Sequence, residues 1–127
     1  MKVFDTNHIL RFILQDNEEM ADHVEHLLNS YTVYVPYEVL AEACYVMTKV
    51  YGIDRKDAAA ALQAFLAIEH VRTDHTAVSR RCLNLYSHSA LDFVDCLLCA
   101  YHAELGHEIC TFDKKMLRMI RTLDEIT

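Results

Sequence analysis

The sequence predicts an α/β fold with a parallel sheet covered by helices on both faces. Short apolar runs typical of buried strands alternate along the chain with longer segments of helical periodicity. At 127 residues, with 53% apolar residues, two glycines and one proline, the chain can bury a sizeable core and leaves little room for long loops. We therefore expect a single domain over residues 1–127.

Caps and helix breakers define the elements of the first part. Pro36 ends a β-branched run and suits the first turn of the helix that follows. Asp16 or Asn17 is placed to cap a helix, and Asp54 with Asp57 resembles a capping box. The expected elements are strands at 2–4, 32–35 and 70–72, a short helix through 9–13, and helices at 18–28, 37–50 and 54–68.

The second part is expected to add three helices and one or two strands. Gly106 is placed as a helix terminator, because glycine readily adopts the left-handed conformation found after helix ends. The apolar run from Glu108 to Phe112 predicts a further strand, and an edge strand is expected near Leu123 to Ile126. The expected helices are 75–86, 91–105 and 114–120, and the sheet would be mainly parallel with four to five strands.

The net charge of −7 argues against a protein that holds nucleic acid through a broad basic face. It does not exclude a metal-dependent nuclease, because acidic metal ligands themselves lower the formal charge. Local basic residues could still form a rim, or they could be solvated helix faces. These residues are Lys114, Lys115, Arg118 and Arg121, with a second cluster at Arg80 and Arg81.

The cysteine pattern and the lack of a membrane segment suggest a soluble cytoplasmic protein. The five cysteines form an odd set without paired spacing, which fits buried thiols in a reducing compartment. No apolar run approaches the length of about 18 residues that a membrane-spanning helix needs. The expected first strand begins near Met1, which leaves no room for a signal peptide.

Two carboxylates close apolar runs at opposite ends of the chain. Asp5 follows the first expected strand, and Asp113 follows the run that ends at Phe112. Because the carboxyl ends of parallel strands meet at one edge of a sheet, where ligands bind, we expect these acids to lie close together. Two acids at one place predict a cation site.

Two more acids occupy apolar helical surroundings. Asp95 has apolar neighbours on both sides within the first turn of its helix, where the helix dipole contributes only about 0.3–1 kcal/mol, less than burying an unpaired carboxylate costs. Asp92 is the competing candidate, and its simplest role is the N-cap of that helix. Glu42 lies in the apolar run Val39 to Cys44, where the alternative is an ordinary surface position.

These fragments together resemble the PIN-domain ribonucleases, and within them the VapC-type toxins of toxin–antitoxin pairs. The matching fragments, in order, are Asp5-Thr6-Asn7, Val39-Leu40-Ala41-Glu42, Asp92-Phe93-Val94-Asp95-Cys96-Leu97-Leu98 and Thr111-Phe112-Asp113. The resemblance implies a three-layer α/β/α PIN-like domain and a ribonuclease that depends on Mg²⁺ or Mn²⁺. It also implies an RNA substrate, a cognate antitoxin protein and a homodimer.

The resemblance assigns the catalytic residues as Asp5, Glu42, Asp95 and Asp113. Of these, Asp5, Asp95 and Asp113 would be the metal ligands, while Glu42 would be an outer ligand or the base that orients water. Two carboxylates ~5 Å apart at an effective dielectric of ~20 repel by roughly 3 kcal/mol, and a hard divalent cation relieves this repulsion. The auxiliary residues would be Thr6, Asn7, Thr111 and Asp92.

Other interpretations have weaker support. A zinc site at Cys96-Leu97-Leu98-Cys99 lacks a second ligand pair. His23 and His26 lack a third metal ligand nearby, and His102 lies seven residues after Asp95 on roughly the same helical face, without an assigned role. A non-toxin PIN nuclease in RNA processing and a catalytically silent binding module remain the alternative functions.

Overall fold

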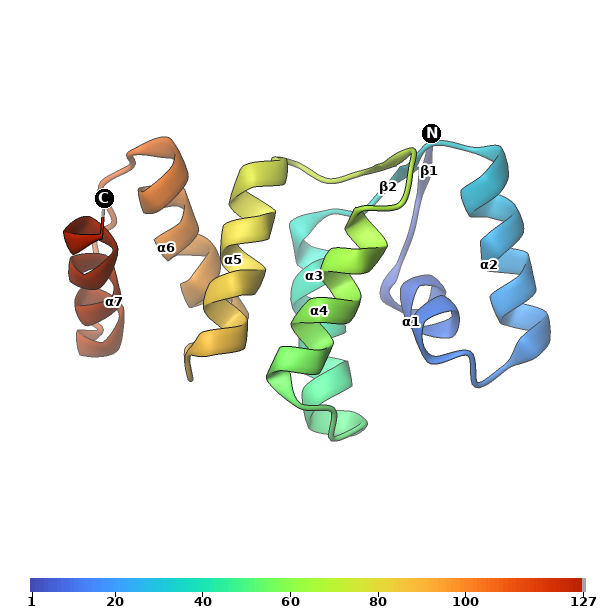
Figure 1. Cartoon of the computed structure of the whole chain (residues 1–127), viewed down its shortest axis with the longest axis horizontal. Coiled ribbons are helices and arrows are strands. Elements are labelled where there is room, and N and C mark those ends of the chain that lie inside the picture. The colour runs from blue at the N-terminus through green and yellow to red at the C-terminus, as the bar shows by residue number, and fades with distance from the viewer. Residues whose placement is uncertain (127) are drawn as a thin grey trace. The chain divides into compact units, whose positions relative to one another are not determined.

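The computed structural model describes residues 1–126 and contains two compact units, Met1–Asp74 and His75–Thr127 (Figure 1). The first unit contains the parallel sheet and the helices that connect its strands. In the described part of the second unit, the regular elements are helices. The chain therefore has the predicted α/β class, while the three-layer arrangement and the single domain over residues 1–127 stay predictions.

The sheet has three parallel strands in the order β1 (Lys2–Val3), β2 (Val33–Tyr34) and β3 (Val71–Arg72). Each strand pairs with the next one along the chain, and the ladder extends past β1 where the Phe4 N–H donates to the Tyr34 carbonyl at 3.1 Å. Val33 in the central strand is fully buried, as expected for a parallel sheet. The three expected strands of the first part are confirmed.

The helices of the first unit follow the predicted order. They are α1 (Thr6–Leu14), α2 (Glu18–Ser30), α3 (Tyr37–Tyr45), the π-helical η1 (Val46–Val50) and α4 (Arg55–Leu66). Figure 1 shows α3 and α4 side by side, and these two helices are in contact. The boundaries differ from the predicted ones by a few residues, which is common at helix ends.

The cap of α2 resolves an alternative that the sequence left open. The side chain of Asn17 accepts a hydrogen bond from the Met20 N–H at 3.0 Å and so caps the helix. Asp16 instead accepts from the Arg11 guanidinium at 3.0 Å. Asp54 caps α4 as expected, accepting from the Lys56 N–H at 3.4 Å.

The helix predicted over 37–50 forms, but its last turns are π-helical. The hydroxyl of Thr48 donates to the Cys44 carbonyl at 2.7 Å, one turn earlier in the chain. Such side-chain bonds to the preceding turn compete with the helical ladder and often bend it. This contact offers a local reason for the change from α3 to η1.

Aromatic packing supports the core of the first unit. The Phe65 side chain of α4 is 2% exposed, and its ring centroid lies 6.3 Å from Phe4 and 5.7 Å from Phe12. These distances are typical of favourable edge-to-face and tilted aromatic pairs. The Phe65 side chain thus links α4 to α1 and to the residue that follows β1.

Asp74 links the ends of β2 and β3 to the start of α3. Its carboxylate accepts a hydrogen bond from the Tyr34 hydroxyl, and it accepts from the Tyr37 N–H at 3.2 Å. The hydrogen bond to Asp74 raises the pKa of Tyr34 to about 12. The carboxylate after the third strand therefore has a structural role.

The described part of the second unit consists of α5 (Thr76–His88), α6 (Phe93–Leu105) and α7 (Lys114–Glu125), with α6 in contact with both of the others (Figure 1). Gly106 ends α6 in the left-handed conformation, with φ of +71°, as its position predicts. Tyr86 lies in an aromatic contact with Phe93, with ring centroids 6.4 Å apart. This contact connects α5 to the start of α6.

Two predicted strands are wrong. Glu108 to Phe112 is irregular and lies outside the three-stranded sheet, and residues 123–125 belong to the amphipathic helix α7. A strand requires a hydrogen-bonded neighbour, which a short apolar run cannot specify by itself. The sheet described by the structure thus has three strands rather than four to five.

The cysteines are free, and most of them are buried as expected. Cys44, Cys82, Cys96 and Cys99 are buried, whereas Cys110 is exposed. Burial raises the pKa of the Cys99 thiol to about 11, which favours the protonated thiol over the thiolate that zinc prefers. The buried side chains of Cys96 and Cys99 therefore fit hydrophobic packing. Among the described helices, none is long and apolar enough to cross a membrane.

The ion pair between α6 and α7 predicts a pH-dependent contribution to stability. His102 Nε2 lies 2.7 Å from Asp124 Oδ1, and this hydrogen bond is the main cause of the raised pKa of His102. Because the pKa is higher in the folded state, the contribution is complete below the unfolded pKa of about 6.5 and is lost as pH rises through the folded pKa. The free energy of unfolding in urea, measured for the wild type below the unfolded pKa and again above the folded pKa of His102, should show this loss.

Asp124→Asn provides the control for this prediction. The partly exposed ion pair contributes at most about 1 kcal/mol. The difference in the free energy of unfolding between low and high pH should therefore shrink in the variant, by no more than that amount. If the unfolding free energy changes with pH equally in the wild type and in Asp124→Asn, the pH dependence does not come from the ion pair of His102 and Asp124.

Candidate active site

Asp5 lies directly after the first strand segment and begins α1. Its Oδ1 accepts from the His8 N–H at 2.9 Å and lies 3.0 Å from His8 Nδ1. The backbone hydrogen bond from His8 is the main cause that holds the pKa of Asp5 below its usual value. The Asp5 side chain is 72% exposed, and the backbone N–H of Asn7 also contributes to the lowered pKa of this carboxylate. The Asp5 carboxylate therefore caps the helix and is also exposed at the surface, where a ligand can reach it.

Thr6 and Asn7 follow Asp5 in the first turn of α1. Thr6 is 7% exposed, and its Oγ1 has no hydrogen-bond partner within residues 1–126. A buried hydroxyl without a partner is unusual and points to a water or another ligand that completes it. Asn7 is exposed and lines a pocket between α1 and α2. Their predicted auxiliary roles are compatible with these positions.

Glu42 and Glu38 lie one turn apart on α3, in the same unit as Asp5. Both side chains are exposed, while the neighbouring Ala43 and Cys44 are buried. Glu38 is in the first turn of α3, where an acid is stabilised by the helix dipole. Glu42 occupies a surface position, so its role in catalysis stays a prediction.

Asp95 lies in the first turn of α6 and is half-buried, as its apolar surroundings suggest. Burial is the main cause that raises its pKa, and the charges of Asp113 and Asp92 raise it further. No basic side chain in the described residues forms an ion pair with Asp95. The expected repulsion among these acids is therefore present within the second unit.

Asp113 and Asp92 stand at the starts of two helices of that unit. Asp113 caps α7, accepting from the Met116 N–H at 3.0 Å, and its own N–H donates to Thr111 Oγ1 at 3.0 Å. Asp92 is the N-cap residue of α6, as expected, but its side chain makes no capping hydrogen bond. Thr111 thus orients the backbone at Asp113, and the Asp92 carboxylate remains available to the acid cluster.

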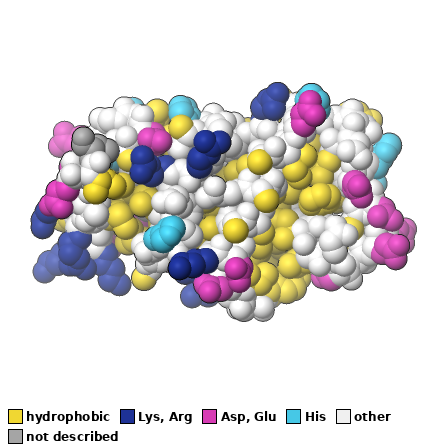
Figure 2. All heavy atoms as spheres, in the orientation of Figure 1, with side chains coloured by type: hydrophobic (Ala, Val, Ile, Leu, Met, Phe, Trp, Pro, Cys, Tyr) yellow, Lys and Arg dark blue, Asp and Glu magenta, His cyan; other side chains and the backbone are white. Residues whose placement is uncertain are grey.

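Basic side chains accompany these acids. Lys114, Lys115, Arg118 and Arg121 are exposed on α7, and Figure 2 shows dark blue side chains gathered over this helix. Arg81 instead lies 3.6 Å from Glu104 in an ion pair. The α7 residues therefore fit the predicted basic rim better than Arg81 does.

His8 is a candidate functional residue that the sequence reasoning missed. Its side chain contacts the Asp5 carboxylate, and its ring centroid lies 6.2 Å from that of His23. The spacing of three residues between Asp5 and His8 is the spacing of a helix cap, which could have indicated the contact. His23 therefore lies beside His8, a contact that the sequence did not predict.

The donor set suits a hard divalent cation. Carboxylates of Asp95, Asp113 and Asp92 interact electrostatically in the second unit, while the first unit has the exposed carboxylate of Asp5 and the buried hydroxyl of the neighbouring Thr6. Oxygen ligands of this kind are those that Mg²⁺ and Mn²⁺ prefer. Within residues 1–126, no three or more His, Cys, Asp or Glu side chains are grouped so that they could hold a metal ion.

Comparison with known proteins finds similarity over nearly the whole chain. A VapC ribonuclease from Aquifex aeolicus (strain VF5) is 26% identical over 125 residues, covering 94% of this chain and 92% of that protein. No solved structure matches the chain. The PIN domain family model matches residues 2–121, which include every candidate acid. The chain therefore belongs to the PIN domain family.

Proposed function

We propose that this protein is a metal-dependent endoribonuclease that hydrolyses RNA phosphodiester bonds and acts as the toxin of a toxin–antitoxin pair. The observation that carries the proposal is Asp95, a half-buried carboxylate whose pKa is raised by burial and by two neighbouring acids. Such a group gains most from a cation. Membership of the PIN family and similarity to a VapC ribonuclease support the reaction class.

In this proposal, Asp5, Asp95 and Asp113 hold the cation, and Glu42 is either an outer ligand or the base that orients water. When bound, Mg²⁺ or Mn²⁺ supplies Lewis-acid chemistry, which activates water and offsets charge at the phosphorus. Asp5 is anchored for this role by the hydrogen bond from His8, and Asp113 by its cap of α7. The auxiliary groups Thr6, Asn7, Thr111 and Asp92 would hold water or substrate.

The basic residues of α7 would hold the RNA backbone. Lys114 and Lys115 directly follow Asp113, so phosphates bound by these side chains would lie beside a proposed cation ligand. Because each neutralised phosphate releases counterions, binding should weaken as salt increases. By family resemblance, the products would carry 5′-phosphate and 3′-hydroxyl ends.

The same proposal includes a cognate antitoxin, a homodimer and action in the cytoplasm. A basic segment of the antitoxin would complement the net charge of −7, and such complementarity speeds association. Growth arrest on expression, relieved by the adjacent small gene, is the expected result. Normal growth with intact protein that still cleaves RNA would instead indicate a PIN nuclease of RNA processing.

The direct test incubates the purified full chain with structured RNAs, including tRNAs and rRNA fragments. Cleavage is expected with Mg²⁺ or Mn²⁺ and should stop when EDTA removes the ion. Calorimetric titration with each metal should show binding that Asp5→Asn weakens. Cleavage that survives EDTA would contradict the mechanism, and the absence of both cleavage and metal binding would favour a silent binding module.

A further inference from the structure

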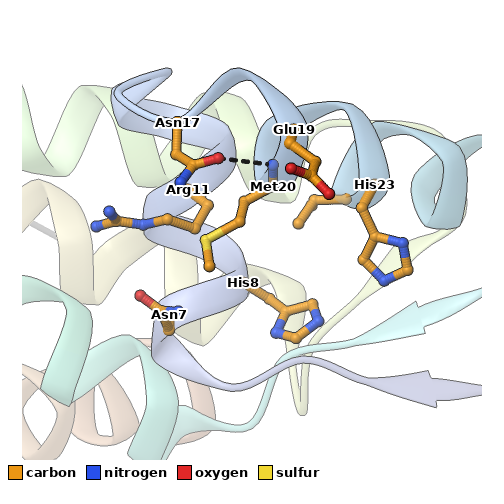
Figure 3. A pocket seen from close by; sticks show the side chains of 8 residues that line it. Asn7, His8, Arg11, Asn17, Glu19, Met20 and His23 are labelled. Atoms are coloured by element: carbon orange, nitrogen blue, oxygen red, sulfur yellow. Dashed lines mark hydrogen bonds between the residues drawn. The ribbon is translucent and has the colours of Figure 1, made fainter.

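A pocket in the first unit lies between α1 and α2, beside Asp5 but outside the proposed ligand set. Its volume is about 490 Å³, within the range of small-ligand sites. Figure 3 shows that α1 contributes Asn7, His8 and Arg11, while α2 contributes Met20 and His23. None of these side chains is used as a cation ligand in the proposed mechanism.

Two imidazole rings and a thioether form much of the wall. The ring centroids of His8 and His23 lie 6.2 Å apart with an interplanar angle of 64°, and Met20 extends from α2 toward α1 between Arg11 and His8 (Figure 3). His8 also contacts Phe4, with centroids 5.3 Å apart. Imidazole faces are surfaces on which proteins stack unpaired nucleobases.

The charges at the pocket disfavour an ionic ligand. The Arg11 guanidinium is already held by Asp16 and the Tyr51 hydroxyl, each at 3.0 Å. Glu19 is the acidic residue of the lining, so the formal charges of Arg11 and Glu19 cancel. A neutral, flat group therefore fits this pocket better than a phosphate.

The acidic residues of α2 do not change this conclusion. Glu18, Asp22 and Glu25 are absent from the pocket lining, and at about 100° per residue they lie on another face of α2 than His23. The pocket face and the acidic face are thus separate. Phosphates would be disfavoured at the acidic face, whereas a base in the pocket would not contact it.

Polar groups at the pocket could read the edge of such a base. The Asn7 side chain makes no hydrogen bond to the rest of residues 1–126, and the Asn17 amide uses its oxygen to cap α2, which leaves its NH₂ group free. His8 Nδ1 lies 3.0 Å from Asp5 Oδ1, so when Nδ1 donates to Asp5, Nε2 of the neutral ring can accept. Amides and imidazoles match the donors and acceptors of nucleobase edges.

We propose that this pocket binds one unpaired base of the RNA, stacked against His8 and His23. The proposal rests on the ribonuclease function and adds to it a determinant of substrate choice. Because His8 contacts Asp5 directly, a base held there lies next to a proposed cation ligand. The base in the pocket would therefore influence which phosphodiester bond is presented for cleavage.

The test measures RNA binding by the full chain in EDTA, where cleavage is blocked. Short single-stranded oligoribonucleotides carrying 2-aminopurine are titrated with the wild type, His23→Ala, His23→Phe and His26→Ala. His26 is the matched control, because it is an exposed histidine of the same helix outside the pocket lining. His23→Ala should bind about fivefold or more weakly, while His23→Phe keeps a flat ring and most of the affinity.

Salt dependence distinguishes a base from a phosphate. Loss of a phosphate contact would reduce the slope of log affinity against log salt by about 0.7, whereas loss of stacking leaves the slope unchanged. An unchanged slope with weaker binding in His23→Ala, and wild-type binding in His26→Ala, is the expected result. A reduced slope would overturn the base assignment.

The remaining outcomes separate this proposal from the proposed function. If the wild type binds RNA, cleaves it with Mg²⁺, and His23→Ala does both equally well, the base pocket is wrong while the ribonuclease stands. If His23→Ala weakens binding of an oligoarginine peptide but not of RNA, the pocket serves a protein partner and the proposal fails. A wild type that neither binds nor cleaves RNA overturns both.

Discussion

Replacing Asp95 by asparagine is expected to reduce RNA cleavage by more than about 100-fold, because even outer-shell partners of a metal site typically contribute ~10–100-fold. Without added metal, the same variant should be at least as stable as the wild type. The pKa of Asp95 is raised, so its ionised form is disfavoured in the folded protein, and a neutral side chain of similar shape removes this penalty. Cleavage assays and thermal unfolding in EDTA measure the two effects.

Metal-dependent stabilisation gives an independent signature of the same site. Mg²⁺ or Mn²⁺ should raise the melting temperature of the wild type by mass action, and this increase should be largely lost in Asp95→Asn. Asp92→Asn is the matched comparison, since Asp92 is an exposed acid of the same helix start and makes no capping hydrogen bond. It should reduce activity less than Asp95→Asn does. Equal losses in the two variants would contradict the assignment of Asp95 as ligand.

Truncating Phe65 to alanine is expected to destabilise the protein by about 3–5 kcal/mol, the usual loss for a buried phenylalanine. The side chain is 2% exposed and contacts Phe4 and Phe12, so the variant loses buried area and aromatic contacts and leaves a cavity. Urea unfolding monitored by circular dichroism measures the change. RNA cleavage by the folded fraction should remain, because the ring partners of Phe65 are Phe4 and Phe12 rather than a proposed ligand.

Phe65→Leu is the control for this prediction. Leucine retains most of the buried volume but not the ring contacts, so its loss should be clearly smaller than that of alanine. If both variants lose the same stability, the ring contacts rather than the cavity dominate. If neither variant changes the urea midpoint, Phe65 does not contribute to the core as described.

The sequence predicts elements best where the signal is local. Pro36 and Gly106 act at a helix start or end through their own backbone preferences, and Asp54 acts through a side-chain cap. Each marks the boundary that it predicts. The run from Glu108 to Phe112 lacks such a local determinant. Its side chains favour a strand, but a strand forms only when another strand is paired beside it, which neighbouring residues do not encode.

Candidate residues are predictable from the sequence where burial conflicts with charge. Asp95 stands out because apolar neighbours surround a carboxylate, and the raised pKa agrees with that conflict. The contact of Asp5 with His8 depends on side-chain conformation at a helix start, and the pocket beside His23 requires two helices to pack at a particular angle. Such contacts are properties of the packed structure, which residue types alone do not determine.

The caps formed by Asp5 and Asp113 restrict which residues these positions can accept during evolution. Asparagine would preserve the start of each helix but forfeit the charge, and glutamate would keep the charge on a side chain one methylene longer, which moves the oxygen away from the backbone N–H. Alanine would lose both functions. None of these three substitutions keeps both the cap and the charge in place, so selection for activity should leave both positions little freedom to change.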